Sequence, residues 1–92
     1  MKTDLKAYLK HVRKRMKRFR KDEYLRIFYK SQADELEQLI RCEITAEDLP
    51  DLLEAHERAK NGYWASDKQM YRIFDAKEVL IRDLILREGR AK

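Results

Sequence analysis

Apolar residues recur along this chain at intervals of three and four positions, which is the spacing of one face of an α-helix. The first such stripe follows steps of 4, 3, 4 and 3 and consists of Leu5, Leu9, Val12, Met16 and Phe19. It predicts a helix with Thr3 as its N-cap that ends near Arg20. Asp22 offers a second N-cap, and one bent helix running through this point is the competing interpretation.

A second helix is predicted over residues 23–43, where the apolar face from Leu25 to Ile40 is wider than a coiled-coil seam. A face of this width is typical of a helix that packs against two neighbours. The chain then turns at 46–49, where the run Thr45-Ala-Glu-Asp48 resembles a capping box with Asp in place of Glu.

A short third helix is predicted from Pro50 to about Lys60, because proline is favourable at the first helical position. Asn61-Gly62 is expected to end it. The run Ser66-Asp-Lys-Gln69 has the form of a full capping box and predicts the start of the last helix. This helix should continue for about 22 residues to Gly89, which would close it.

Composition narrows the fold class. Two glycines and one proline in 92 residues, with no alternating strand pattern, favour helices joined by short connections. We therefore expect an all-α fold over a single domain, residues 1–92, built as a small helical bundle of three long helices and one short helix. The absence of a long apolar run, of a signal-peptide pattern and of a second cysteine besides Cys42 leads us to expect a cytoplasmic protein.

Charge is distributed very unevenly. Residues 1–21 carry ten Lys or Arg and one acid, a net charge of +9, whereas residues 34–57 carry nine acids and one base, a net charge of −8. The whole chain has a formal net charge of +5. The two regions can partly neutralise each other, but nine acids cannot reach every side of one cationic helix, so some cations should face outward.

Eight of the twelve residues from Lys10 to Lys21 are Lys or Arg, and none is acidic. An outward row of such residues is the usual electrostatic footprint of a nucleic-acid-binding protein. The sequence therefore predicts a protein that binds the phosphate backbone of DNA or RNA, free or within a nucleoprotein complex. The candidate binding residues are Lys10, Arg13, Lys14, Arg15, Lys17, Arg18, Arg20 and Lys21.

A different class of function is also open. The small size and patchy charge resemble those of inhibitors and regulators carried by phages and other mobile elements, which dock on a host protein or nucleoprotein complex and block it. The acidic segment would then enter a basic groove, and two aromatic residues would be anchors. The candidate residues for this alternative are Glu47, Asp48, Asp51, Glu54, Glu57, Tyr63 and Trp64. In either case we expect a monomer or a homodimer.

Catalysis is not expected. His11 and His56 lie on different predicted helices, and His56 is best interpreted as a structural histidine. No His, Cys, Asp or Glu cluster has metal-ligand spacing, and no glycine-rich phosphate loop is present, so neither a metal nor a cofactor is expected. A helix-turn-helix that presents Lys68, Gln69 and Arg72, and a helix lying on a membrane surface, are weaker alternatives.

Overall fold

A computed structural model describes residues 1–90, and it confirms the predicted all-α class. The four α-helices in this range are α1 (Leu5–Arg18), α2 (Glu23–Arg41), α3 (Leu49–Arg58) and α4 (Lys68–Arg90). A 3-10 turn, η1 (Ala46–Asp48), leads into α3, and a π-helical turn, η2 (Ala59–Tyr63), follows it.

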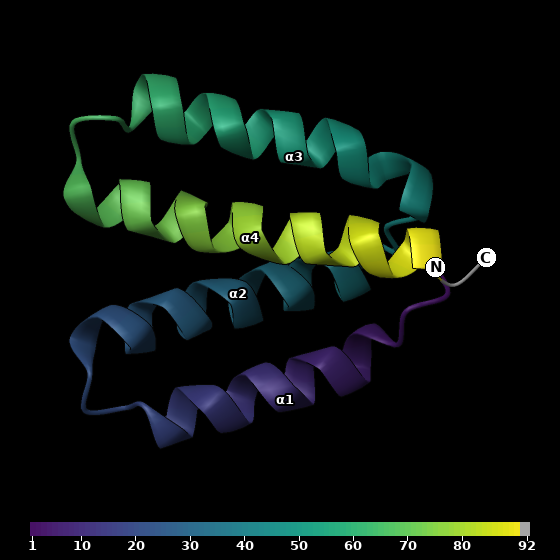
Figure 1. Cartoon of the computed structure of the whole chain (residues 1–92), viewed down its shortest axis with the longest axis horizontal. Helices are drawn as coiled ribbons and strands as arrows, with labels where there is room; N and C mark the ends of the chain where they lie inside the picture. Colours follow the sequence, from purple (N-terminus) through teal and green to yellow (C-terminus); the bar gives the residue numbers. More distant parts are fainter. Residues whose placement is uncertain (91–92) are drawn as a thin grey trace.

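The helices form two antiparallel hairpins, α1–α2 and α3–α4, which pack together through α2 and α4 (Figure 1). In that view α2 and α4 occupy the centre and run in the same direction, while α1 and α3 lie on the outside. The cationic N-terminal helix therefore covers one flank of the bundle, where only α2 and the last turns of α4 lie against it.

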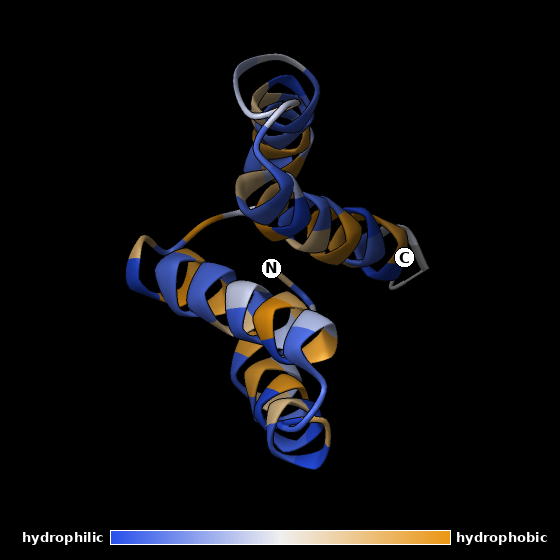
Figure 2. Cartoon of the chain, turned by 90° about the vertical axis from the view of Figure 1, so that its left-hand side faces the viewer, coloured by the Kyte–Doolittle hydropathy of each residue, from blue (hydrophilic) through white to orange (hydrophobic). Residues whose placement is uncertain are grey.

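The apolar stripe of α1 faces the interior. Leu9 and Val12 are buried in the main core, and the other members of the stripe are half-buried. Hydrophobic and hydrophilic residues alternate along each helix in Figure 2, as a one-sided apolar face requires. The remaining buried core consists of Ala33, Leu36, Leu39, Leu49, Leu80, Ile81 and Leu84.

The predicted start of the first helix is wrong by one residue. Asp4, not Thr3, is the N-cap, and its carboxylate accepts a hydrogen bond from the Ala7 N–H at 3.1 Å. Thr3 instead donates from its backbone N–H and its hydroxyl to the Glu88 carboxylate, at 2.8 and 2.6 Å. Because that contact joins opposite ends of the chain, cap preferences alone do not predict it.

The break between the first two helices is confirmed, and the single bent helix is excluded. α1 ends at Arg18 with Phe19 as its C-cap, so Arg20 and Lys21 lie in the turn and not in the helix. Asp22 caps α2 by accepting a hydrogen bond from the Leu25 N–H at 3.1 Å.

The second helix ends two residues before the predicted Glu43. Cys42 is the C-cap, and Glu43 has a φ of 51°, in the left-handed region. A residue in that conformation stops the helix and returns the chain, so the Ile44 N–H reaches back to the Leu39 carbonyl at 3.1 Å. The turn is normally favourable for Gly or Asn, which is why a sequence with Glu at this position does not reveal it.

At the third helix the predicted capping box is confirmed, but the helix begins and ends at other residues than predicted. The capping box of Thr45 and Asp48 is present and opens η1. The short helix starts at Leu49 rather than Pro50, which still lies in its first turn. The predicted stop at Asn61-Gly62 is wrong, because the chain continues as η2 until the Trp64 N–H bonds to the Ala59 carbonyl at 2.8 Å.

The last helix begins later and ends later than predicted. The expected cap at Ser66 is replaced by Asp67, whose carboxylate accepts a hydrogen bond from the Met70 N–H at 3.1 Å. Gly89 does not close the helix, since α4 continues through it to Arg90. Its described length is 23 residues, close to the predicted value.

Alkaline pH should destabilise the fold through two groups. Burial, together with a 2.5 Å hydrogen bond that the hydroxyl donates to Asp83, raises the pKa of Tyr8. A hydrogen bond to Glu78 raises the pKa of Lys60. In the unfolded chain Tyr and Lys titrate near pH 10 to 10.5. The stabilisation of the fold by each group is therefore complete below about pH 10 and is lost at higher pH.

We therefore expect the thermal midpoint to fall above about pH 10, and to fall less steeply in the Tyr8→Phe variant, which has no phenol to ionise. Thermal melts followed by circular dichroism across this range test both statements. An identical alkaline decline in the two proteins would show that the Tyr8 phenol does not contribute.

Candidate nucleic-acid interface

The predicted binding residues lie on α1 and in the turn that follows it, and we call these eight residues together the cationic face. Its eight members are Lys10, Arg13, Lys14, Arg15, Lys17, Arg18, Arg20 and Lys21, and all are exposed. α1 positions the first six, because its apolar stripe is turned inward and every other row points to solvent. The turn between α1 and α2 holds the last two.

Most of the cationic face has no acidic partner. Within residues 1–90, Arg13 alone among the eight forms an ion pair, with its Nη2 atom 2.6 Å from Oε1 of Glu37. Both side chains are largely exposed, so this pair stabilises the fold little. The Arg18 guanidinium lies over the Phe19 ring, 5.5 Å from its centre. The positive charge of this face is therefore available to an external anion.

One side of α1 has a hollow bordered by cations alone. Its volume is about 420 Å³, and it is lined by Lys6, Lys10, Arg13, Lys14 and Lys17. These positions are three and four residues apart and so share one face of the helix. Like charges at this spacing repel by a few tenths of a kcal/mol per pair. Bound phosphates would relieve that repulsion.

A second hollow, of about 340 Å³, lies between α1 and α2. α1 and the turn after it contribute Arg13, Met16, Lys17 and Arg20, and α2 contributes Arg26, Lys30, Ala33 and two acids, Asp34 and Glu37. Arg26 and Lys30 therefore extend the positive charge onto α2, where Asp34 and Glu37 partly offset it. Arg26 and Lys30 were not among the binding residues predicted from the sequence, although an antiparallel hairpin with a tight turn at 19–22 places them beside the first helix.

Within residues 1–90, Glu37 is the one acid of residues 34–57 that forms an ion pair with α1, at Arg13 in the second half of that helix. Asp34 lines the same hollow as Arg13 and Lys17. Asp34 pairs with Lys30 of its own helix. Glu35 is buried on the opposite side of α2, because the broad apolar face of this helix packs against α4 as well as α1.

The acidic residues assigned to a partner surface are mostly engaged within the fold. Asp48 accepts hydrogen bonds from the Thr45 N–H and hydroxyl at 3.1 and 3.0 Å. Glu54 pairs with Arg58 one turn further along α3. Glu57 lies 2.9 Å from Arg82 of α4. Within residues 1–90, Glu47 and Asp51 are exposed and form no ion pair.

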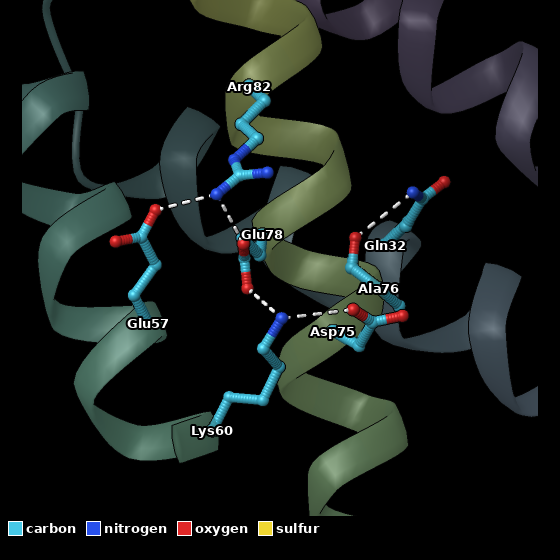
Figure 3. A network of polar contacts seen from close by, with 7 residues as sticks. All are labelled: Gln32, Glu57, Lys60, Asp75, Ala76, Glu78 and Arg82. Atoms are coloured by element: carbon cyan, nitrogen blue, oxygen red, sulfur yellow. Dashed lines mark hydrogen bonds and ion pairs between the residues drawn. The ribbon is translucent and has the colours of Figure 1, made fainter. Parts of the chain in front are cut away.

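A buried network joins α3 and η2 to α4 (Figure 3). The Glu78 side chain is 5% exposed, with one carboxylate oxygen 2.5 Å from the Lys60 amine and the other 2.7 Å from the Arg82 guanidinium. The same amine lies 3.3 Å from Asp75, and the same guanidinium lies 2.9 Å from Glu57. These ion pairs therefore link α3 and η2 to α4.

His56 is buried, as a structural histidine should be. Its Nε2 atom lies 2.8 Å from the Glu35 carboxylate, and the Lys77 amine is 3.9 Å from the same oxygen. These three groups come from α3, α2 and α4 respectively. The other histidine, His11, is exposed on α1. No group of three His, Cys, Asp or Glu side chains in residues 1–90 is arranged to hold a metal ion.

Tyr63 and Trp64, the candidate anchors, occupy the connection between α3 and α4. Tyr63 is 82% exposed, whereas Trp64 is half-buried. The two rings meet edge to face with their centres 5.0 Å apart. Tyr63 therefore projects into solvent, whereas Trp64 is partly covered.

None of the helices in the described part of the chain combines the length and the apolar composition needed to cross a bilayer. Comparisons of the chain with protein-family models, curated proteins and solved structures found no match in any of the three. The functional proposal therefore rests on the geometry and charge of the cationic face.

Proposed function

We propose that the chain is a non-enzymatic protein that binds the phosphate backbone of a nucleic acid, free or within a nucleoprotein complex, through the cationic face. The observation that supports this proposal is that seven of its eight exposed cations form no ion pair within residues 1–90. When unpaired cations neutralise phosphates, counterions condensed on the nucleic acid are released. This release is the main source of affinity in non-specific binding.

The two hollows suggest how a backbone would lie on this surface. The first follows one side of α1, and the second lies between α1 and α2, with Arg13 and Lys17 shared by both. Consecutive phosphates can therefore contact both helices. Contacts of this kind position the protein on the nucleic acid without specifying a base sequence.

One observation favours the second candidate, docking on a protein or nucleoprotein complex. Tyr63 exposes an aromatic ring beyond the end of the bundle, beside the half-buried Trp64. Tyr and Trp are enriched among residues that dominate binding energies at interfaces. Glu47 and Asp51 would add a weak acidic border to such a surface. A phage-type inhibitor that blocks its target could bind in this way.

Neutralising acids near α3 separates the two candidates. We expect Glu47→Gln, Asp51→Asn and Glu54→Gln together to leave nucleic-acid affinity equal or to raise it a few-fold, because repulsion of phosphate decreases. If the protein instead docks through this segment, the triple variant should lose its activity in cells, because complementary charge sets the encounter rate and the specificity of docking. Fluorescence anisotropy with a labelled oligonucleotide, alongside a cellular activity assay, measures both.

Asp51 lies in the first turn of α3, where its negative charge contributes up to about 1 kcal/mol. The thermal midpoint of the triple variant must therefore be measured with its affinity. A folded variant with intact nucleic-acid binding and no cellular activity would identify the acidic segment, rather than the cationic face, as the functional surface.

A further inference from the structure

Four aromatic rings follow one another across the end of the bundle where α1 turns into α2, and we call them the aromatic row. Phe19 stacks on Tyr29 with ring centres 5.9 Å apart, and Tyr29 meets Phe28 edge to face at 5.4 Å. Phe28 in turn stacks on Tyr24 at 6.3 Å. The row therefore connects the C-cap of α1 to the first turn of α2.

An arginine lies over the ring at each end of the aromatic row. The Arg18 guanidinium is 5.5 Å from the centre of Phe19, and the Arg72 guanidinium, from α4, is 5.1 Å from the centre of Tyr24. Both arginines are exposed. The four rings therefore lie between two exposed guanidinium groups, and the cationic face reaches the Phe19 end of the row.

Phosphate-binding groups adjoin the row directly. Phe19 lines a hollow of about 520 Å³ whose other walls are Lys17, Arg18, Arg20, Lys21 and Asp22. Four of these five neighbours are cations of the cationic face. A backbone that followed the cationic face to the turn would therefore bring its bases to the aromatic row.

Closing the end of the bundle does not fully account for the row. Tyr29 packs against the buried core, but none of the four rings is part of it, and Tyr24 is 44% exposed. A ring that only sealed the core would be covered, whereas Tyr24 remains partly exposed beside the exposed Arg72 guanidinium. Such a combination is typical of surfaces on which unpaired bases stack.

We propose that the protein prefers single-stranded nucleic acid, with unpaired bases stacking on the aromatic row while the cationic face follows the backbone. The inference rests on the proposed function, because it assigns the class of nucleic acid that the same surface selects. In a duplex the bases are already stacked and paired inside the helix, so the row gains nothing from them. Base stacking on aromatic side chains tolerates any base sequence.

The test compares an oligothymidylate strand with a duplex of equal length, at the same salt concentration. The variants are Tyr24→Leu, which keeps an apolar side chain against Phe28 but removes the flat ring, and Phe19→Leu. The matched control is Tyr71→Leu, which removes a ring on α4 that is 39% exposed and also has a cation over it, with the Lys60 amine 5.5 Å from the ring centre. Circular dichroism melts establish that each variant is folded.

We expect the native protein to bind the strand about tenfold more tightly than the duplex, and Tyr24→Leu to lose about tenfold on the strand with little change on the duplex. Tyr71→Leu should alter neither affinity. A strand carrying 5-iodouracil should cross-link to the aromatic row. If Phe19→Leu fails to fold, Tyr24→Leu decides the result alone, because its position is the exposed one.

Equal affinity for strand and duplex, indifferent to Tyr24→Leu, would overturn this inference and leave backbone binding in place. A loss in Tyr24→Leu that is the same for strand and duplex would also overturn it, since the ring would then not be contacting bases. Failure to bind either nucleic acid would remove the proposed function itself, and the inference with it.

Discussion

Replacing Lys10, Lys14 and Lys17 with Gln should lower duplex affinity by about 500-fold at 0.1 M salt. These three lysines line the cation-only hollow on α1, and none of them forms an ion pair within residues 1–90. Each phosphate contact contributes about 0.9 to the slope of log K against log[salt] on duplex DNA, and about 0.7 on a single strand. Losing three contacts therefore makes the slope shallower by about 2 to 3.

The measurement is a series of anisotropy titrations over salt concentration. If the native protein contacts about six phosphates, its slope should be near −5 on a duplex, and that of the triple variant near −2.5. The fold should not suffer, because Lys10 and Lys14 are one helical turn apart and their mutual repulsion is removed. Unchanged helical circular dichroism would confirm that only binding has changed.

A control variant with the same net charge tests whether position matters. Arg41, Arg58 and Lys68 are exposed at the end of α2, on α3 and at the start of α4, outside both cationic hollows. Their replacement by Gln should leave the slope almost unchanged. If both triple variants lost affinity equally, the attraction would come from net charge alone, and the cationic face would not be a binding site.

Removing either partner of the buried pair between Lys60 and Glu78 should destabilise the protein by about 2 to 4 kcal/mol. The Glu78 side chain is 5% exposed and that of Lys60 is 12% exposed, so the remaining charge would lose its nearest partner in a poorly hydrated site. Lys60 would retain Asp75 at 3.3 Å. Arg82 retains contact with Glu78, which keeps the cost of Lys60→Met towards the lower end. Each kcal/mol should lower the thermal midpoint by about 4 to 8 °C in a domain of this size.

The double variant Lys60→Met and Glu78→Met should recover much of this loss, because two apolar side chains of similar length leave no unpaired charge between them. Urea denaturation of both single variants and the double variant gives the coupling energy, which we expect to exceed about 1.5 kcal/mol. The exposed pair of Arg58 and Glu54 is the matched control, and its loss should cost below about 0.5 kcal/mol. Strictly additive single effects would show that the buried pair does not act as a unit.

The sequence by itself determined the class of fold and the character of the candidate site. Helical periodicity and side-chain caps involve residues within a few positions of one another, so the stripe of α1 and the caps at Asp22 and Thr45 could be predicted. The exposure of the cationic face followed from the same local geometry. Because the apolar stripe of α1 faces the interior, the charged rows of this helix face solvent.

Only the tertiary structure decided which charges meet and which surfaces join. Glu37 reaches Arg13 while the neighbouring Glu35 turns to His56, because the crossing of α2 over α1 and α4 sends adjacent residues to opposite partners. The aromatic row and its Arg72 combine the C-cap residue of α1 with residues of α2 and α4, so no single segment contains the pattern. The end of α2 before Glu43 and the continuation of α3 into η2 likewise depend on how the chain returns to the core. Contacts of this kind depend on register and packing between helices, which the periodicity of one helix does not encode.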